Sequence, residues 1–120
     1  MHAKKKIEIL VIDDNIDMLQ WFELLNNSAS PYHFHILQNE LNITRTLDKV
    51  KPDLILLDVT LNSLDGPLVA SIMGGTENGN VPIIYISADK KNRQIILSDD
   101  FLMKPFTKEI IFEKIKEKLG

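Results

Sequence analysis

The sequence contains no cysteine among its 120 residues. A disulfide framework and a thiolate metal site are therefore excluded, and the composition fits a reducing compartment. No stretch is long and apolar enough to cross a membrane, and the N-terminus lacks the apolar core of a signal peptide. These absences predict a soluble cytoplasmic domain with no membrane partner.

A long run of basic residues is also missing, and the formal net charge is −3. The short Lys4-Lys5-Lys6 stretch is interpreted as a solvated segment that leads into the first strand. Direct binding of nucleic acid by this domain is therefore not expected.

Repeats, linkers and low-complexity segments are absent as well. The length suits one domain spanning residues 1–120, and a hydrophobic share of 44% is enough to fill a core.

Short continuous apolar runs are the main feature that is present. Such runs are typical of buried parallel strands, and we expect strands at 7–12, 54–57 and 82–87. Further strands are expected at 32–37 and 101–103, with helices after Asp14, near 42–50, near 68–73 and from the N-cap Thr107 to the C-terminus.

Strands and helices therefore alternate along the chain. This order predicts an α/β fold with a doubly wound five-stranded parallel sheet and helices on both faces. The pattern over residues 88–100 barely exceeds two helical turns, so the fourth helix is expected to be short or irregular.

Polar residues stand at the ends of four of these apolar runs. They are Asp13-Asp14, Asp58, Ser87 and Lys104. Parallel strands end at the same edge of a sheet, and open α/β sheets bind ligands at that carboxyl edge. Three carboxylates, a hydroxyl and an ammonium group in one small volume suit a divalent cation together with a phosphoryl group.

The paired acids allow two interpretations. An aspartate after a strand often caps the following helix, but one is enough for that role. Clustered carboxylates repel one another unless a cation neutralises them, and Mg²⁺ is commonly held by one or two carboxylates. The pattern favours a Mg²⁺ site at Asp13, Asp14 and Asp58, where Asp58 can act as a nucleophile and form an aspartyl phosphate.

Ser87 and Lys104 supply the groups that would contact a phosphoryl oxygen, a hydroxyl donor and a compact positive charge. The Lys104–Pro105 bond is a candidate cis peptide that would direct the ammonium group inward. The hypothesis requires the three carboxylates to converge on one cation, and a basic side chain fixed permanently among them would exclude it.

Together these residues resemble the receiver domain of two-component response regulators over nearly the whole chain. The resemblance rests on Asp13-Asp14, Leu54 to Asp58, Asp65-Gly66, Ser87-Ala88 and Lys104-Pro105-Phe106. It implies the flavodoxin-like strand order 2-1-3-4-5, of which a receiver is a known example.

The resemblance also implies a role for each matching position. Asp58 matches the phosphoacceptor, and Asp13 and Asp14 match the acidic pair around Mg²⁺. The remaining matches are the Thr60 backbone carbonyl as third protein ligand, Ser87 as switch hydroxyl, Lys104 as the family's lysine and Phe101 as aromatic switch. Phe101 also fits a plain sheet residue, so both interpretations stand.

A receiver accepts its phosphoryl group from a histidine kinase or phosphotransfer protein, with Mg²⁺ as cofactor. It catalyses only its own phosphorylation and dephosphorylation, so it is not an enzyme in the usual sense. The downstream effector is open, and a homodimer is possible. No effector domain follows Gly120, which leaves a stand-alone regulator and a piece of a larger protein as alternatives.

Departures from the family pattern keep a second reading open, a pseudo-receiver that mediates protein contacts without phosphorylation. Asn62 replaces a frequent proline, and Leu97-Ser98 replaces the usual Gly-Ala in a shortened segment. A flavin-binding module would need a different loop from Asp13-Asp14-Asn15. A haloacid-dehalogenase-like phosphatase would need an aspartate where Thr60 stands.

Two histidines, His33 and His35, alternate along a predicted strand and therefore share one face. Such a pair could bind a metal. Without a third ligand, however, the pair is interpreted as part of a solvated face.

Overall fold

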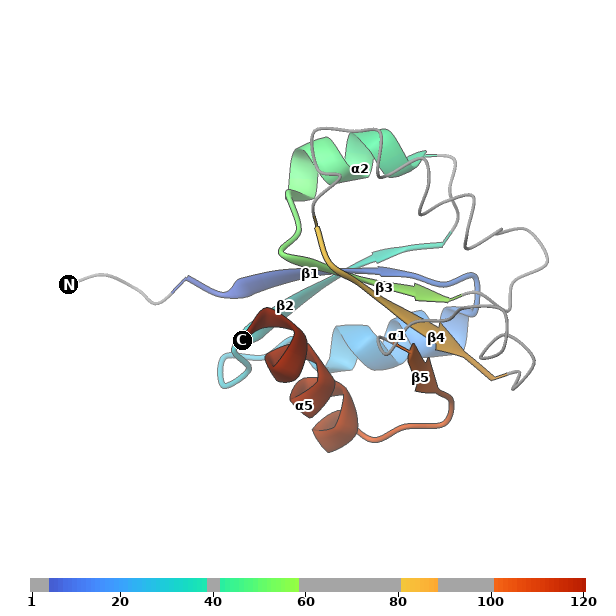
Figure 1. Cartoon of the computed structure of the whole chain (residues 1–120). Coiled ribbons are helices and arrows are strands. Elements are labelled where there is room, and N and C mark those ends of the chain that lie inside the picture. The colour runs from blue at the N-terminus through green and yellow to red at the C-terminus, as the bar shows by residue number, and fades with distance from the viewer. Residues whose placement is uncertain (1–4, 39–41, 59–80, 89–100) are drawn as a thin grey trace.

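Five parallel strands form the centre of the molecule (Figure 1). The computed structural model describes residues 5–38, 42–58, 81–88 and 101–120. The strands are β1 (Ile7–Ile12), β2 (Tyr32–Leu37), β3 (Leu54–Asp58), β4 (Ile83–Ser87) and β5 (Phe101–Met103). They are hydrogen-bonded in the order β2-β1-β3-β4-β5, which confirms the predicted topology.

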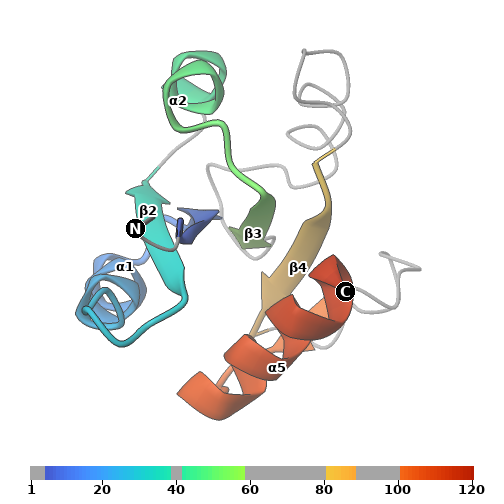
Figure 2. The same ribbon diagram turned by 90° about the vertical axis from the view of Figure 1, so that its left-hand side faces the viewer.

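Helices cover both faces of this sheet. The described helices are α1 (Ile16–Leu24), α2 (Ile43–Val50) and α5 (Lys108–Leu119). Helices α1 and α5 lie on one face and α2 on the other (Figures 1 and 2). None of the described helices is long and apolar enough to cross a membrane. The helices predicted near 68–73 and within 88–100 fall on residues outside the described ranges.

The sheet divides the core into two layers. On the side of α1 and α5, Leu54 and Leu56 pack with Phe22 and Ile111. On the side of α2, Ile55 and Leu57 pack with Leu47. Every residue of β3 is buried because alternate side chains enter opposite layers, which explains the uninterrupted apolar sequence from Leu54 to Leu57.

Side-chain caps fix where two of the helices begin. The Asn15 side chain accepts a hydrogen bond from the Met18 N–H at 3.1 Å and caps α1. Thr107 caps α5, as predicted, by accepting from the Ile110 N–H at 3.2 Å. Since Asn15 caps α1, helix capping does not account for the aspartates at positions 13 and 14.

Candidate functional site

The predicted polar residues meet at the carboxyl edge of the sheet because the strand register brings them there. The Asp13 N–H donates to the Leu37 carbonyl at 3.1 Å, which continues the ladder between β1 and β2. Asp58 ends β3 and Ser87 ends the neighbouring β4. The Lys104 N–H donates to the Ser87 carbonyl at 2.8 Å, so backbone pairing places Lys104 beside the end of β4.

Three of these side chains are removed from water. Asp13, Asp58 and Ser87 are each 0% exposed. A buried carboxylate is costly unless a positive charge or hydrogen bonds compensate it. The site therefore needs cationic partners for its two buried aspartates.

Lys104 supplies one such partner. Its Nζ donates to Asp13 Oδ2 at 2.9 Å and also to Asp58 Oδ2. The Lys104 side chain is 13% exposed, and the Lys104–Pro105 peptide bond is cis. Carboxylates from two different strands thus converge on one position of positive charge, which the ammonium group holds in this structure.

The pKa values show that burial still disfavours the charged form of Asp13. Burial raises the pKa of Asp13 from 3.8 to about 6, against the lowering effect of Lys104 and of the Asn15 N–H, while Asp58 raises it further. Burial by itself lowers the pKa of Lys104, but hydrogen bonds to Asp58 and Asp13 outweigh it and raise the pKa overall. Two buried carboxylates thus share one ammonium group, and this contact does not fully offset the cost of burying the Asp13 charge.

The other predicted site residues differ in what the structure describes. Asp14 directly follows Asp13 and is partly exposed, and Phe101 is buried at the first position of β5. Thr60, Asn62, Asp65-Gly66 and residues 89–100 lie outside the described ranges.

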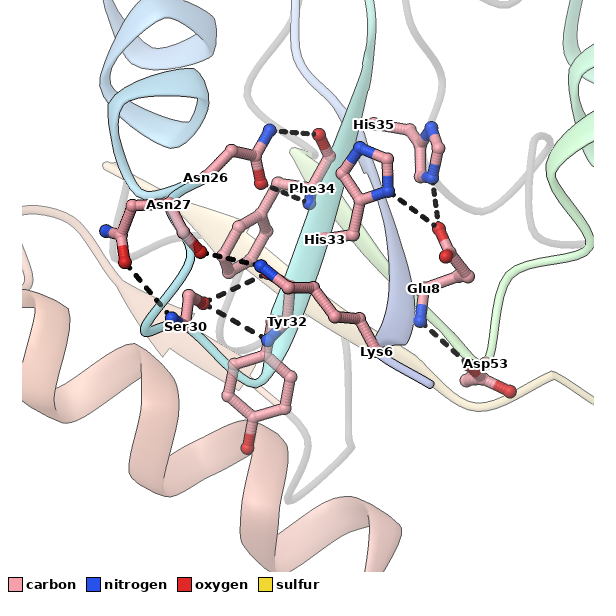
Figure 3. Close-up of polar contacts among 10 residues, drawn as sticks. All are labelled: Lys6, Glu8, Asn26, Asn27, Ser30, Tyr32, His33, Phe34, His35 and Asp53. Carbon is pink, nitrogen blue, oxygen red and sulfur yellow. Dashed lines mark hydrogen bonds and ion pairs between the residues drawn. The ribbon is translucent and has the colours of Figure 1, made fainter. Parts of the chain in front are cut away.

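Two residues near predicted positions were missed. The Asn15 N–H donates to Asp13 Oδ1 at 2.9 Å, and its side chain caps α1. The preference of asparagine for the N-cap could have identified it. Glu8 contacts both His33 and His35, so the interpretation that this histidine pair lacks a third ligand was wrong (Figure 3).

A doubly wound parallel sheet with polar side chains gathered at its carboxyl edge defines the class of open α/β domains, which bind their ligands at that edge. Within that class the family is clear, because the model of the response regulator receiver domain matches residues 9–116. The chain belongs to this family. It is a signalling module of two-component systems rather than a classical enzyme, and receiver domains typically use Mg²⁺.

Curated relatives cover this chain almost completely. The chain is 32% identical over 118 residues to the Bacillus subtilis protein YvcP, described as an uncharacterized transcriptional regulatory protein. The matched region covers 92% of this chain and 48% of YvcP. It is 25% identical over 120 residues to the chemotaxis protein CheY of Listeria monocytogenes, covering 92% of this chain and 97% of CheY.

Solved structures agree on the fold. A putative response regulator from Chloroflexus aurantiacus superposes with a TM-score of 0.81 at 21% identity, covering 96% of this chain and 98% of that one. The chain spans only part of several curated relatives, from 20% of the yeast transcription factor SKN7 to 50% of YxdJ of Bacillus subtilis.

Proposed function

We propose that Asp58 accepts a phosphoryl group from the phosphohistidine of a histidine kinase or phosphotransfer protein. The observation that carries this proposal is the convergence of two fully buried carboxylates on one cationic position, Asp13 just after β1 and Asp58 at the end of β3. Burying two carboxylates costs desolvation free energy, which a purely structural role would not require. The pKa of Asp13 is also raised, and strongly shifted pKa values cluster at functional sites.

The residues present fit a Mg²⁺ ion. Asp13, Asp14, Asp58 and the Thr60 carbonyl would hold it, all through oxygen, which is the ligand chemistry that Mg²⁺ prefers. When bound, Mg²⁺ neutralises charge on the carboxylates and on the phosphoryl oxygens. The Lys104 ammonium sits on a flexible four-carbon side chain that still reaches solvent, so it can give up its place between the carboxylates.

Asp58, Lys104 and Ser87 have different roles in the proposed phosphoryl transfer. An oxygen of the Asp58 carboxylate attacks phosphorus, the P–N bond to the donor breaks, and its electron pair returns to the imidazole. Lys104 already contacts Asp58 and is within reach of a phosphoryl oxygen on that side chain. The Ser87 hydroxyl, at the end of the neighbouring strand, donates to another phosphoryl oxygen.

Signalling follows from a shift between conformers that exist before phosphorylation. The phosphoryl group can shift that equilibrium only through contacts that differ between the two states. Contacts to Ser87 and Lys104 are the proposed source of this difference, with the Phe101 ring turning inward once the Ser87 hydroxyl has moved.

A pseudo-receiver is the second candidate, and one observation favours it. Lys104 contacts both Asp13 and Asp58, so part of the buried charge is already compensated without metal or phosphate. A receiver of this kind would bind partner proteins through its surface and would not form an aspartyl phosphate.

Intact-mass measurement after incubation with Mg²⁺ and acetyl phosphate separates the candidates. The phosphoacceptor proposal expects a phosphate adduct on the wild type and on the exposed-site control Asp48→Asn, and none on Asp58→Asn. The absence of an adduct from all three proteins would support the pseudo-receiver. Rapid turnover of phosphate esters by the wild type would instead indicate a phosphatase.

A further inference from the structure

A second cluster of metal-ligating side chains lies on the α2 side of the sheet, away from the carboxyl edge. On β2, Tyr32 and Phe34 enter the core that faces α1 and α5. His33 and His35 alternate with them and therefore project from the opposite face. Glu8 lies on the adjacent strand β1, directly paired with His33 (Figure 3).

All three side chains point at one another. His33 Nδ1 lies 3.3 Å from Glu8 Oε2, and His35 Nε2 contacts the same oxygen. The two imidazole rings are 4.1 Å apart between centroids. One potential ligand atom from each residue lies within 4.8 Å of the other two. The side chains of His33, His35 and Glu8 are 48%, 28% and 23% exposed, so an ion can reach them from solvent.

The backbone holds Glu8 in place from its other side. The Glu8 N–H donates to Asp53 Oδ2 at 2.8 Å, and the Asp53 N–H donates to the Glu8 carbonyl at 2.7 Å. Both histidines lie on a strand that is paired with β1 along its whole length. Ligands carried by paired strands are held more rigidly than ligands on loops, which favours a preorganised site.

We propose that Glu8, His33 and His35 bind a divalent late transition metal ion, with Zn²⁺ as the representative species. Two imidazoles and a carboxylate form a ligand set that suits Zn²⁺ and disfavours Mg²⁺, which prefers oxygen alone. Ligands at Zn–N and Zn–O bond lengths in a tetrahedron are about 3.3 Å apart. The separation of 3.3 Å between His33 Nδ1 and Glu8 Oε2 matches this spacing, whereas the His35 ring contacts the same oxygen directly and would move outward to the ligand distance when the ion binds.

The ion would take the place of the direct contacts between the carboxylate and the rings. Three protein ligands leave a fourth tetrahedral position for water or for a donor from another molecule. The bound ion would link the edge strand β2 to β1. Because Glu8 lies on β1 and Asp13, five residues later, directly follows that extended strand, this site is separated from the carboxyl edge by about 16 Å. It does not depend on phosphorylation.

Zinc titration against a chromophoric chelator tests the proposal. The chain has three histidines, so all proteins carry His2→Ala to remove the histidine that lies outside the cluster. Excess Mg²⁺ is present throughout, so that Zn²⁺ binding to the carboxyl-edge acids is suppressed. The expected result is one tightly bound Zn²⁺ per chain of His2→Ala protein.

Variants on this background locate the bound ion. Adding Glu8→Gln, His33→Gln or His35→Gln is expected to weaken Zn²⁺ binding by at least about tenfold, since even partners outside the ligand shell contribute that much. Adding Asp58→Asn is expected to leave it unchanged. The proposal is overturned if His2→Ala protein binds no Zn²⁺, or if the three cluster variants bind it as tightly as the background does.

Thermal unfolding and cobalt spectroscopy give independent readouts. Zn²⁺ should raise the Tm of His2→Ala protein in a concentration-dependent way, and this rise should be lost in the His35→Gln variant. Co²⁺ should give the visible absorption of a tetrahedral nitrogen–oxygen site, again only with the cluster intact. Circular dichroism without metal identifies any variant that fails to fold, and the remaining two variants then decide the outcome. An unchanged Tm rise in all folded variants would overturn the proposal.

Discussion

Asp13 shows how one buried residue makes the fold depend on pH. Its pKa is about 6 in the folded protein against an ordinary 3.8, chiefly because of burial. Between these two pH values the folded state binds more protons than the unfolded state. Stability contributed by this group therefore falls as pH rises from about 4 to about 6, and the loss is complete above the folded pKa.

Replacing this charge should stabilise the metal-free protein. Asp13→Asn is expected to raise the free energy of unfolding at pH 8 by up to about 3 kcal/mol, with little gain at pH 4 where Asp13 is already neutral. Urea denaturation at the two pH values without divalent cations measures this difference. The exposed control Asp48→Asn should show no such dependence, and a loss of stability at pH 8 in Asp13→Asn would contradict the prediction.

Lys104 is the counterpart of Asp13, since it compensates both buried carboxylates. Lys104→Met would leave Asp13 and Asp58 without their ammonium partner and is expected to lower the free energy of unfolding by about 3 kcal/mol without metal. Under the proposed function, Mg²⁺ would then bind more tightly than to the wild type because no ammonium group competes for the same position.

Urea denaturation with and without Mg²⁺ measures both effects of Lys104→Met. The exposed lysine of α2 gives a matched control, Lys49→Met, which should change stability by no more than about 0.5 kcal/mol. Weaker Mg²⁺ binding in Lys104→Met than in the wild type would show that Lys104 does not compete with the ion.

The N-cap of helix α1 stabilises the helix without supplying a side chain to the candidate Mg²⁺ site. Asn15 caps α1 with its side chain but contacts Asp13 only through its backbone N–H. Asn15→Ala is therefore expected to cost about 1 kcal/mol of stability while leaving Mg²⁺ affinity unchanged. Chemical denaturation and calorimetric Mg²⁺ titration check the two parts, with Gln20→Ala on the exposed face of α1 as control. A large loss of Mg²⁺ affinity would show that the cap also positions the acids.

The local spacing of apolar residues was sufficient to predict most of the described helices and strands. The apolar run after Pro82 predicted a strand from residue 82, whereas β4 begins at Ile83. Proline has no N–H to donate to a ladder, and the Pro82 carbonyl accepts from the Ile55 N–H at 3.0 Å at the entrance to the strand. The apolar spacing after Asp14 likewise predicted α1, but the choice between capping and metal binding needed the observed cap at Asn15.

At the scale of the whole molecule, strand β1 connects both candidate metal sites. Glu8 lies near its amino end, and Asp13 follows its carboxyl end. If both proposals hold, Mg²⁺ and Zn²⁺ should stabilise the protein independently, because sites more than about 10 Å apart without shared partners usually contribute additively.

Unfolding free energies with each ion alone and with both together test this independence. The stabilisation with both ions should equal the two separate effects within about 0.5 kcal/mol. His2→Ala/His35→Gln protein provides the control, in which the Mg²⁺ effect should remain and the Zn²⁺ effect should disappear. A combined effect no larger than the greater single one would show that the ions compete for one site.

The sequence by itself determined the five-stranded α/β architecture and the edge at which Asp13, Asp58, Ser87 and Lys104 meet, because apolar periodicity reports burial and parallel strands share their carboxyl ends. Only the tertiary structure decided that Lys104 sits between the two aspartates and that the pKa of Asp13 is raised. It also decided that Glu8 joins the two histidines. These facts depend on how side chains are oriented and on how strands that are distant in the sequence pair with one another. A local sequence pattern encodes neither the side-chain orientation nor the pairing.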